Sequence, residues 1–150
     1  MREILFRGKR TGDEKWICGH LLEQNIPDCH SYIVMSIIAE LDNRHIEIMD
    51  FDINEVIPET VGQYTGLTDK NGVKIFEGDI CRFKRFNDVH VGKIVFNVTT
   101  ASFVMWYQSI VGAYGEKATH KMLLSVCDDI EVIGNIHDNP EILKVGDNNE

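Results

Sequence analysis

The sequence predicts a mainly β protein whose second half closes into a small barrel. Short segments of alternating apolar and polar residues follow one another closely, which is typical of half-buried strands. Turn-forming dipeptides such as Asn71-Gly72 separate these segments. The chain has 150 residues, of which 43% are hydrophobic and 26% charged, so it is long enough to bury a core without disulfides.

The first part of the chain, residues 1–58, is predicted to be a β region built from hairpins. Ile4 and Phe6 alternate with polar neighbours, and Gly12-Asp13 then turns the chain. Residues 32–39 are apolar and β-branched, which fits a buried strand, but their periodicity also fits a short helix. Pro58 marks the end of the region. The strands expected are one around Ile4 and Phe6, followed by residues 15–22, 32–39 and 45–51.

The second part, residues 59–144, carries the clearest strand signals. Asn71-Gly72 predicts a type I′ hairpin turn between two strands. Gly92 separates two apolar pairs of opposite parity, so a bulge at Gly92 would return both pairs to the core. Asn139 is expected to cap a last helical turn. The strands expected are residues 61–67, 73–76, 79–86, 89–96, 102–107, 122–126 and 130–137, with a loop at 110–117, the helical turn at 141–143 and a flexible tail at 145–150.

The composition narrows the class of protein. Fifteen Lys and Arg residues against 24 Asp and Glu give a net charge of −9, which argues against a dedicated nucleic-acid coat. No apolar run approaches the roughly 20 residues of a membrane span, and the charged first ten residues do not form a secretory signal. We therefore expect a cytoplasmic protein with no membrane partner. The cysteines, expected to be reduced thiols, are Cys18, Cys29, Cys81 and Cys127.

Three motifs resemble one known family. The longest runs from Glu59 to Ile80 and reads Glu-Thr-Val-Gly-Gln-Tyr-Thr-Gly-Leu-Thr-Asp-Lys-Asn-Gly-Val-Lys-Ile-Phe-Glu-Gly-Asp-Ile. The opening residues 1–7 and the closing residues 130–143 agree with it in the right order. Together they resemble the YopX-like family, which bacteriophages and prophages carry. The resemblance implies a mainly β protein with an SH3-like barrel at residues 59–144, and it supplies no catalytic or ligand-binding residue.

Residues 40–59 form the most one-sided stretch of charge in the chain. They contain seven acids and one base, Arg44. Such a surface is suited to electrostatic pairing with a protein partner. The residues predicted to make this protein contact are Glu47, Asp50, Asp52 and Glu55.

A second candidate site is a basic hairpin in the predicted barrel. Its positive side chains and a nearby aromatic residue could bind nucleic acid, because small barrels pair basic grooves with stacking rings. The simpler interpretation is that the charges protect a sheet edge or contact a protein. The residues of the nucleic-acid hypothesis are Arg82, Lys84, Arg85, Lys93 and Trp106.

A calcium loop is a weaker hypothesis. Asp50, Asp52 and Asn54 open like such a loop. However, Glu55 and Val61 stand where the loop needs its glycine and its closing glutamate. A solvated acidic edge is the better interpretation.

Zinc is the other metal considered. Cys18, His20, Cys29 and His30 are residue types that bind zinc. Adjacent residues on a strand point to opposite faces, so Cys29 and His30 would converge only in a loop. No metal and no cofactor are therefore expected.

The sequence contains no readable catalytic motif, so we do not expect an enzyme. The function predicted is a non-catalytic binding or assembly module that contacts a host or phage protein. The alternative is a nucleic-acid-binding module that uses the hairpin from Arg82 to Lys93. Short exposed sheet edges also leave a homo-oligomer open.

Overall fold

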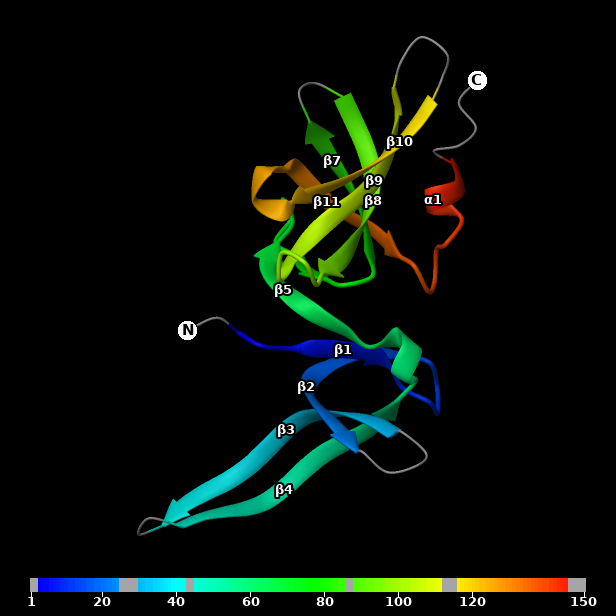
Figure 1. Cartoon of the computed structure of the whole chain (residues 1–150). Coiled ribbons are helices and arrows are strands. Elements are labelled where there is room, and N and C mark those ends of the chain that lie inside the picture. The colour runs from blue at the N-terminus through cyan, green and yellow to red at the C-terminus, as the bar shows by residue number, and fades with distance from the viewer. Residues whose placement is uncertain (1–2, 25–29, 43–44, 86–87, 112–115, 146–150) are drawn as a thin grey trace. The chain divides into compact units, whose positions relative to one another are not determined.

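The computed structural model describes residues 3–24, 30–42, 45–85, 88–111 and 116–145 (Figure 1). Side chains are described for these residues except 24, 36–42, 45–51, 110, 111, 116, 117 and 145. The protein is mainly β, as predicted, with two antiparallel sheets and one short α-helix. The chain divides into two compact units, Met1–Tyr64 and Thr65–Glu150.

The N-terminal unit holds the first five strands of a six-stranded antiparallel sheet with the order β4-β3-β2-β1-β5-β6, whose last strand is β6 (Lys74–Phe76). The segment that could also have been a helix is a strand, because residues 32–39 lie within β3. The elements are β1 (Phe6–Lys9), β2 (Trp16–Gln24), β3 (His30–Asp42), β4 (His45–Val56), the 3-10 turn η1 (Pro58–Thr60) and β5 (Gly62–Thr68), whose last residues belong to the second unit.

β3 and β4 are the longest strands of this unit, and they run beyond the end of their neighbour. β2 pairs with β3 only from His30 to Val34. The rest of β3 pairs, among the described residues, with β4 alone, over Ser36–Asp42. We name residues 35–42 and 45–52 the β3–β4 ribbon, which Figure 1 shows in cyan and teal. Register shifts at Met35 and Met49 bend the ribbon.

The core of the N-terminal unit is small and depends on one close backbone approach. Ile33 and Val56 are fully buried. A Cβ atom at Gly19 would lie 2.2 Å from the carbonyl oxygen of Val34. Only glycine therefore lets β2 and β3 pack this tightly.

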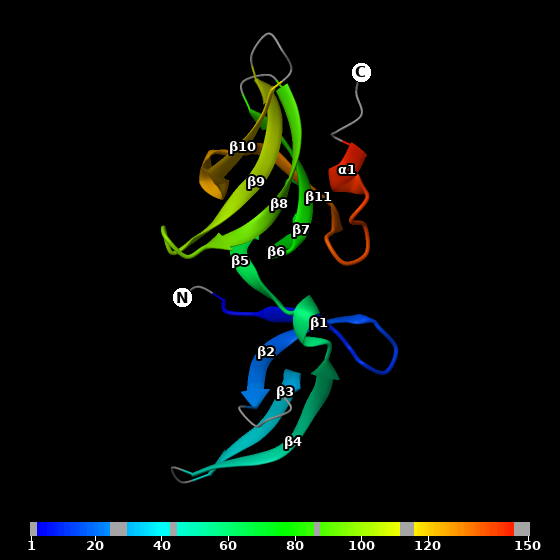
Figure 2. The same ribbon diagram turned by 45° about the vertical axis from the view of Figure 1, so that its right-hand side comes forward.

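The C-terminal unit holds a five-stranded antiparallel sheet with the order β10-β9-β8-β7-β11 (Figure 2). The last strand thus returns to pair with β7, the first strand of this sheet. Among the described residues the ladder is open, so closure into a barrel stays a prediction. The elements are β6 (Lys74–Phe76), β7 (Asp79–Arg85), β8 (Asp88–Asn97), β9 (Ser102–Val111), β10 (Glu116–Leu123), the 3-10 turn η2 (Leu124–Val126), β11 (Asp128–Asn135) and α1 (Ile142–Val145).

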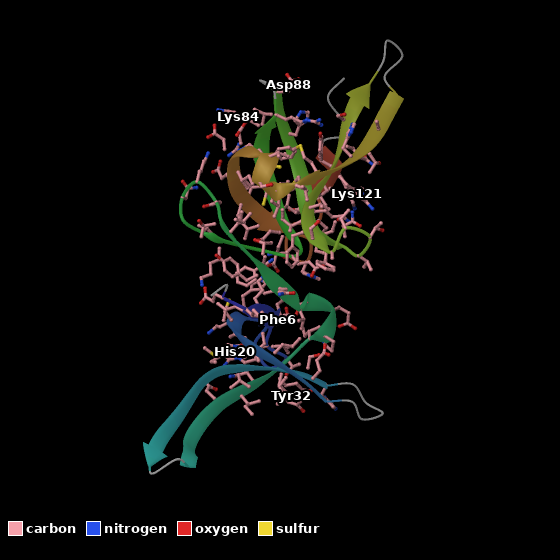
Figure 3. The ribbon with its side chains drawn as sticks, turned by 60° about the vertical axis from the view of Figure 1, so that its left-hand side comes forward. Phe6, His20, Tyr32, Lys84, Asp88 and Lys121 are labelled. Carbon is pink, nitrogen blue, oxygen red and sulfur yellow. The ribbon has the colours of Figure 1, made fainter. Side chains whose placement is uncertain are left out.

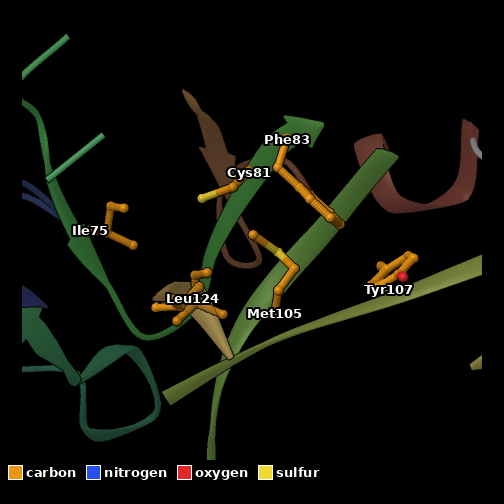
Figure 4. Close-up of a cluster of buried hydrophobic side chains, with 7 residues drawn as sticks. Ile75, Cys81, Phe83, Met105, Tyr107 and Leu124 are labelled. Atoms are coloured by element: carbon orange, nitrogen blue, oxygen red, sulfur yellow. The ribbon is translucent and has the colours of Figure 1, made fainter. Parts of the chain in front are cut away.

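One face of this sheet forms the main core (Figure 4). Phe83 and Tyr107 pack edge to face, with their ring centroids 5.1 Å apart. The cluster draws residues from five elements and therefore holds the sheet together through burial of apolar surface. Its buried members are Ile75, Cys81, Phe83, Ile94, Met105, Tyr107 and Leu124.

The bulge expected at Gly92 is wrong. Gly92 pairs in regular register with Cys81 on one side and Tyr107 on the other. A Cβ atom at Gly92 would lie 2.7 Å from the carbonyl oxygen of Trp106, so glycine serves close packing here. Val89 is left exposed, and the register shifts of this sheet fall in β11 instead.

The turn at Asn71-Gly72 also differs from the prediction. A type I′ turn needs a positive φ at both residues, whereas only Gly72 has one, at +81°. The Asp69 carboxylate accepts the backbone N–H groups of Asn71 and Val73, at 2.8 and 2.9 Å. This side chain favours a longer turn that closes between Asp69 and Val73.

Two further segment boundaries need correction. Of the loop expected at residues 110–117, the first two residues belong to β9 and the last two to β10, and residues 112–115 lie outside the described ones. Residues 124–126 form the 3-10 turn η2 rather than the end of a strand. No helix of the described residues is long and apolar enough to cross a membrane.

Candidate protein-contact and nucleic-acid surfaces

The first candidate surface is the basic hairpin formed by β7 and β8. The sheet register places β11 beside β7, and β11 supplies acids opposite two of the basic residues. Arg82 Nη2 lies 2.9 Å from Glu131 Oε2, and Lys84 Nζ lies 2.5 Å from Asp129 Oδ2. Lys70 Nζ also contacts Glu131, at 2.7 Å. The charges of Arg82 and Lys84, the exposed basic residues of the hairpin, are therefore neutralised by acids of β11.

These ion pairs shift the pKa values of their members. Hydrogen bonds from Lys70 and Arg82 hold the pKa of the Glu131 carboxyl below its usual value. A hydrogen bond from Lys84 lowers the pKa of Asp129, and the same contact raises the pKa of Lys84. Glu131 and Asp129 therefore stay ionised and Lys84 stays protonated at neutral pH.

The other three residues predicted to bind nucleic acid are Arg85, Lys93 and Trp106, and they make two separate contacts. Arg85 donates a hydrogen bond to the hydroxyl of buried Tyr107. Lys93 lies over the ring of Trp106, with its Nζ atom 4.7 Å from the ring centroid. Lys121 is the register partner of Trp106 on the other side, so Trp106 lies between two lysine positions across β8, β9 and β10 (Lys121 in Figure 3).

A cluster of rings around Tyr107 has no counterpart among the predicted sites. The imidazole of His120 stacks on the Tyr107 ring at 5.0 Å, and His90 lies 5.1 Å from it. The Oγ atom of Ser109 lies 2.8 Å from His120 Nε2. Among the described side chains, no carboxylate is seen to orient the His120 ring, as a nucleophilic serine would need. The sequence predicted a strand only from residue 122 onward in this region. A longer strand paired with β9 would have indicated that His120 lies opposite Tyr107.

The second candidate surface lies on the β3–β4 hairpin. Glu47 and Asp50 belong to β4, but their side chains lie outside the described ones. Asp52 is exposed and accepts a hydrogen bond from the Asn54 side chain at 2.7 Å. Glu55 Oε1 lies 2.5 Å from the Nδ1 atom of His30. The structure thus places all four predicted acids on one strand.

An apolar depression opens on the face of this sheet. Its volume is about 410 Å³, and it is lined by Leu22, Glu23, Tyr32 and Ile53 from three adjacent strands. Leu22 is 49% exposed and Ile53 39% exposed. Large apolar side chains beside acidic ones are typical of a surface that contacts another protein.

The three described residues considered for zinc, Cys18, His20 and His30, do not gather. Cys18 and His20 lie on β2, and His30 on β3 contacts Glu55. Cys29 lies outside the described residues. Within the part of the chain that the structure describes, no three metal-ligating side chains come together.

These features define a two-unit, mainly β protein with charged and apolar surfaces on its sheets. The chain belongs to the YopX family: the family model described as YopX protein matches residues 5–144. This confirms the resemblance seen in the sequence motifs.

The fold also occurs in a solved structure. The crystal structure of protein EF1440 from Enterococcus faecalis aligns with a TM-score of 0.57 and 24% sequence identity. The alignment covers 95% of this chain and 99% of that one. No curated protein matches the chain.

Proposed function

We propose that this chain is a non-catalytic binding or assembly module that contacts a host or phage protein through its β3–β4 hairpin. The observation that carries the proposal is the β3–β4 ribbon, which extends past β2 and presents an acidic strand. A ribbon without a third strand buries little surface of its own, so a protein partner would stabilise it. We place the module in the cytoplasm of a bacterial host, and the family resemblance supports a phage or prophage setting.

The SH3-like barrel is part of this proposal. Its support is the strand order β10-β9-β8-β7-β11, with the 3-10 turn η2 just before the strand that returns to β7. That order is the one found in SH3-like barrels. In this interpretation the C-terminal unit fills its interior with side chains and leaves only its outer surface for binding.

Charge reversal tests the proposed contact. The wild-type protein and an Asp50→Lys/Asp52→Lys variant are used to capture partners from a bacterial host lysate, with Glu141→Lys as the control. Glu141 is an exposed acid outside the hairpin. We expect a partner that the wild type and the control retain and the double variant loses. Equal capture by all three proteins, or no partner at all, contradicts the proposal.

A second candidate function is nucleic-acid binding through the C-terminal sheet. The row formed by Lys93, Trp106 and Lys121 favours it, because two cations beside an indole suit a stacked base and its phosphate. The pairing of Arg82 and Lys84 with acids of β11 weakens it.

A gel-shift series at rising salt tests this alternative with single- and double-stranded DNA and RNA. Binding that weakens with salt and falls in Lys93→Glu/Lys121→Glu supports it. No shift at low salt rules it out.

A further inference from the structure

The edge of β4 is open over most of its length. β4 lies at the end of the strand order, so β3 is its only neighbour along the ladder of the described residues. An isolated bridge between Arg10 and Val56 covers the C-terminal end of β4 alone. There, Thr11 N donates to Glu55 O at 3.1 Å and Ile57 N donates to Lys9 O at 2.8 Å. The edge from His45 to Asn54 has no such partner in the described residues.

The bridge shows which backbone groups face this open edge. Along an antiparallel strand, the backbone groups of successive residues point to alternate sides. Since Glu55 faces away from β3, Ile53 and Phe51 face away from β3 as well. Their N–H and C=O groups are therefore available to an added strand. The open edge spans ten residues, or about 30 Å at ~3.3 Å per residue.

Of the edge residues whose side chains are described, Ile53 lies on the face that carries the depression, and its neighbours on β3 and β2 there are apolar. Ile53 and Val34 are register partners on this face, and Tyr32 and Leu22 are register partners next to them. Ile53 and Leu22 line the depression of about 410 Å³. Apolar side chains of an added strand would continue this surface.

The charges indicate the chemistry of the occupant. β3 and β4 contain six acids (Glu40, Asp42, Glu47, Asp50, Asp52 and Glu55) and no lysine or arginine. Pairing of β4 with β4 of a second copy would set acids beside acids, which is unfavourable. A strand that alternates apolar residues with lysine or arginine would meet all three features. Its apolar residues would extend the apolar face, its cations would pair with the acids, and its backbone would form hydrogen bonds with the open edge.

We infer that an extended, basic segment of a partner protein adds to the sheet along the edge of β4 between His45 and Asn54. This inference rests on the proposed function and specifies how the hairpin binds. Strand addition takes its affinity from main-chain hydrogen bonds and its specificity from alternate side chains. An open edge of this length leaves a row of backbone N–H and C=O groups unpaired, and a bound strand would pair them.

The test uses a ten-residue peptide of alternating lysine and valine and the full-length protein. The matched peptide is N-methylated at two successive central residues, which blocks both of its hydrogen-bonding edges at equal charge. On the protein, Ile53→Pro removes one outward N–H group, and Ile53→Val is its control. We expect N-methylation and Ile53→Pro each to weaken binding about tenfold or more, and Ile53→Val to change it by less than about threefold.

Amide hydrogen exchange on the wild-type protein gives a second readout that needs no variant. On peptide addition, the amides of Phe51 and Ile53 should gain protection. The amides of Asp52 and Asn54, which face β3, should change little. Protection of all four amides alike would overturn strand addition.

The outcomes separate this inference from the proposed function. Equal binding of both peptides, reduced by Asp50→Lys/Asp52→Lys, overturns strand addition and leaves a charge-dependent contact. No binding of either peptide at low salt overturns the inference, while the capture experiment still tests the proposed function. A wild-type dimer in sedimentation that Ile53→Pro converts to monomers would show that the occupant is a second copy, which also overturns it.

Discussion

Replacement of Asp69 by asparagine should destabilise the C-terminal unit strongly. Asp69 is only 6% exposed, and its carboxylate accepts three backbone N–H groups. One oxygen accepts those of Asn71 and Val73, and the other accepts that of Val132 in β11, at 3.1 Å. Lys70 N also donates to Ile130 O. The turn from Asp69 to Val73 is therefore hydrogen-bonded to the irregular part of β11.

The magnitude follows from what asparagine would present to these three donors. Its amide oxygen can keep the bonds to Asn71 and Val73, now as weaker neutral bonds. Its NH₂ group would face the N–H of Val132, donor against donor, and a buried donor without a partner costs about 1–3 kcal/mol. The total loss in the free energy of unfolding should be about 3 kcal/mol. At an m value of about 1.5 kcal/mol/M, the urea midpoint should fall by about 2 M.

The assay uses the fact that each unit holds one of the two tryptophans. In a Trp16→Phe background, the fluorescence of Trp106 reports unfolding of the C-terminal unit in urea. Asp88→Asn, a change at an exposed position of β8, is the control and should leave the midpoint nearly unchanged. A loss below about 1 kcal/mol for Asp69→Asn would refute the role assigned to this carboxylate.

The same carboxylate makes a pH prediction. Burial alone would raise the pKa of Asp69, but the N–H groups of Val132, Val73 and Asn71 outweigh it and hold the pKa below 3.8. A group whose pKa is lower in the folded state contributes stability above its unfolded pKa and loses it as the pH falls through the folded value. The stability difference between the wild type and Asp69→Asn should therefore be full near pH 6 and shrink below about pH 4. A difference that stays constant down to pH 2 would contradict this linkage.

Two further predictions concern Gly92 and Cys127. Gly92→Ala should cost about 2–3 kcal/mol in urea unfolding, because its Cβ would meet the Trp106 carbonyl oxygen at 2.7 Å. Gly12→Ala, with nothing within 4 Å, should cost far less, and similar losses in both variants would contradict the packing argument. Burial, then the nearby Asp128 charge, raises the pKa of Cys127 to about 11, so iodoacetamide at pH 8 should modify exposed Cys18 much faster than Cys127. Peptide-resolved mass spectrometry measures both rates, and equal rates would show that the Cys127 thiol is not protected.

Alternation of apolar and polar residues predicted most of this fold. It is a local signal, and the strand that it predicted at residues 79–86 does alternate, with Cys81 and Phe83 buried and Arg82 and Lys84 exposed. The errors fall where one position has two physical explanations. Glycine at position 92 suits either a bulge or a close approach, and only the register with β9 decides between them.

The candidate sites depended more on contacts between distant residues. Arg82 and Lys84 form a basic cluster in the sequence, but residues more than 40 positions away neutralise them. Strand order is a long-range property, so no local pattern could assign Glu131 and Asp129 as their partners. The acids of β4 could be predicted to lie together because they belong to one strand. Their position beside an open edge could not be predicted, because it depends on where the pairing of β2 with β3 ends.

Charged residues are distributed differently on the two sheets, and this difference affects where we expect a partner to bind. In the C-terminal sheet, cations and acids pair across β7 and β11, which covers that strand pair with neutral ion pairs. In the N-terminal sheet, β4 carries acids and no lysine or arginine. Like charges along an edge oppose pairing between copies of the same chain but still permit pairing with a basic strand. For an edge strand that is acidic, long and open, we therefore expect a partner of opposite charge rather than a second copy of the chain.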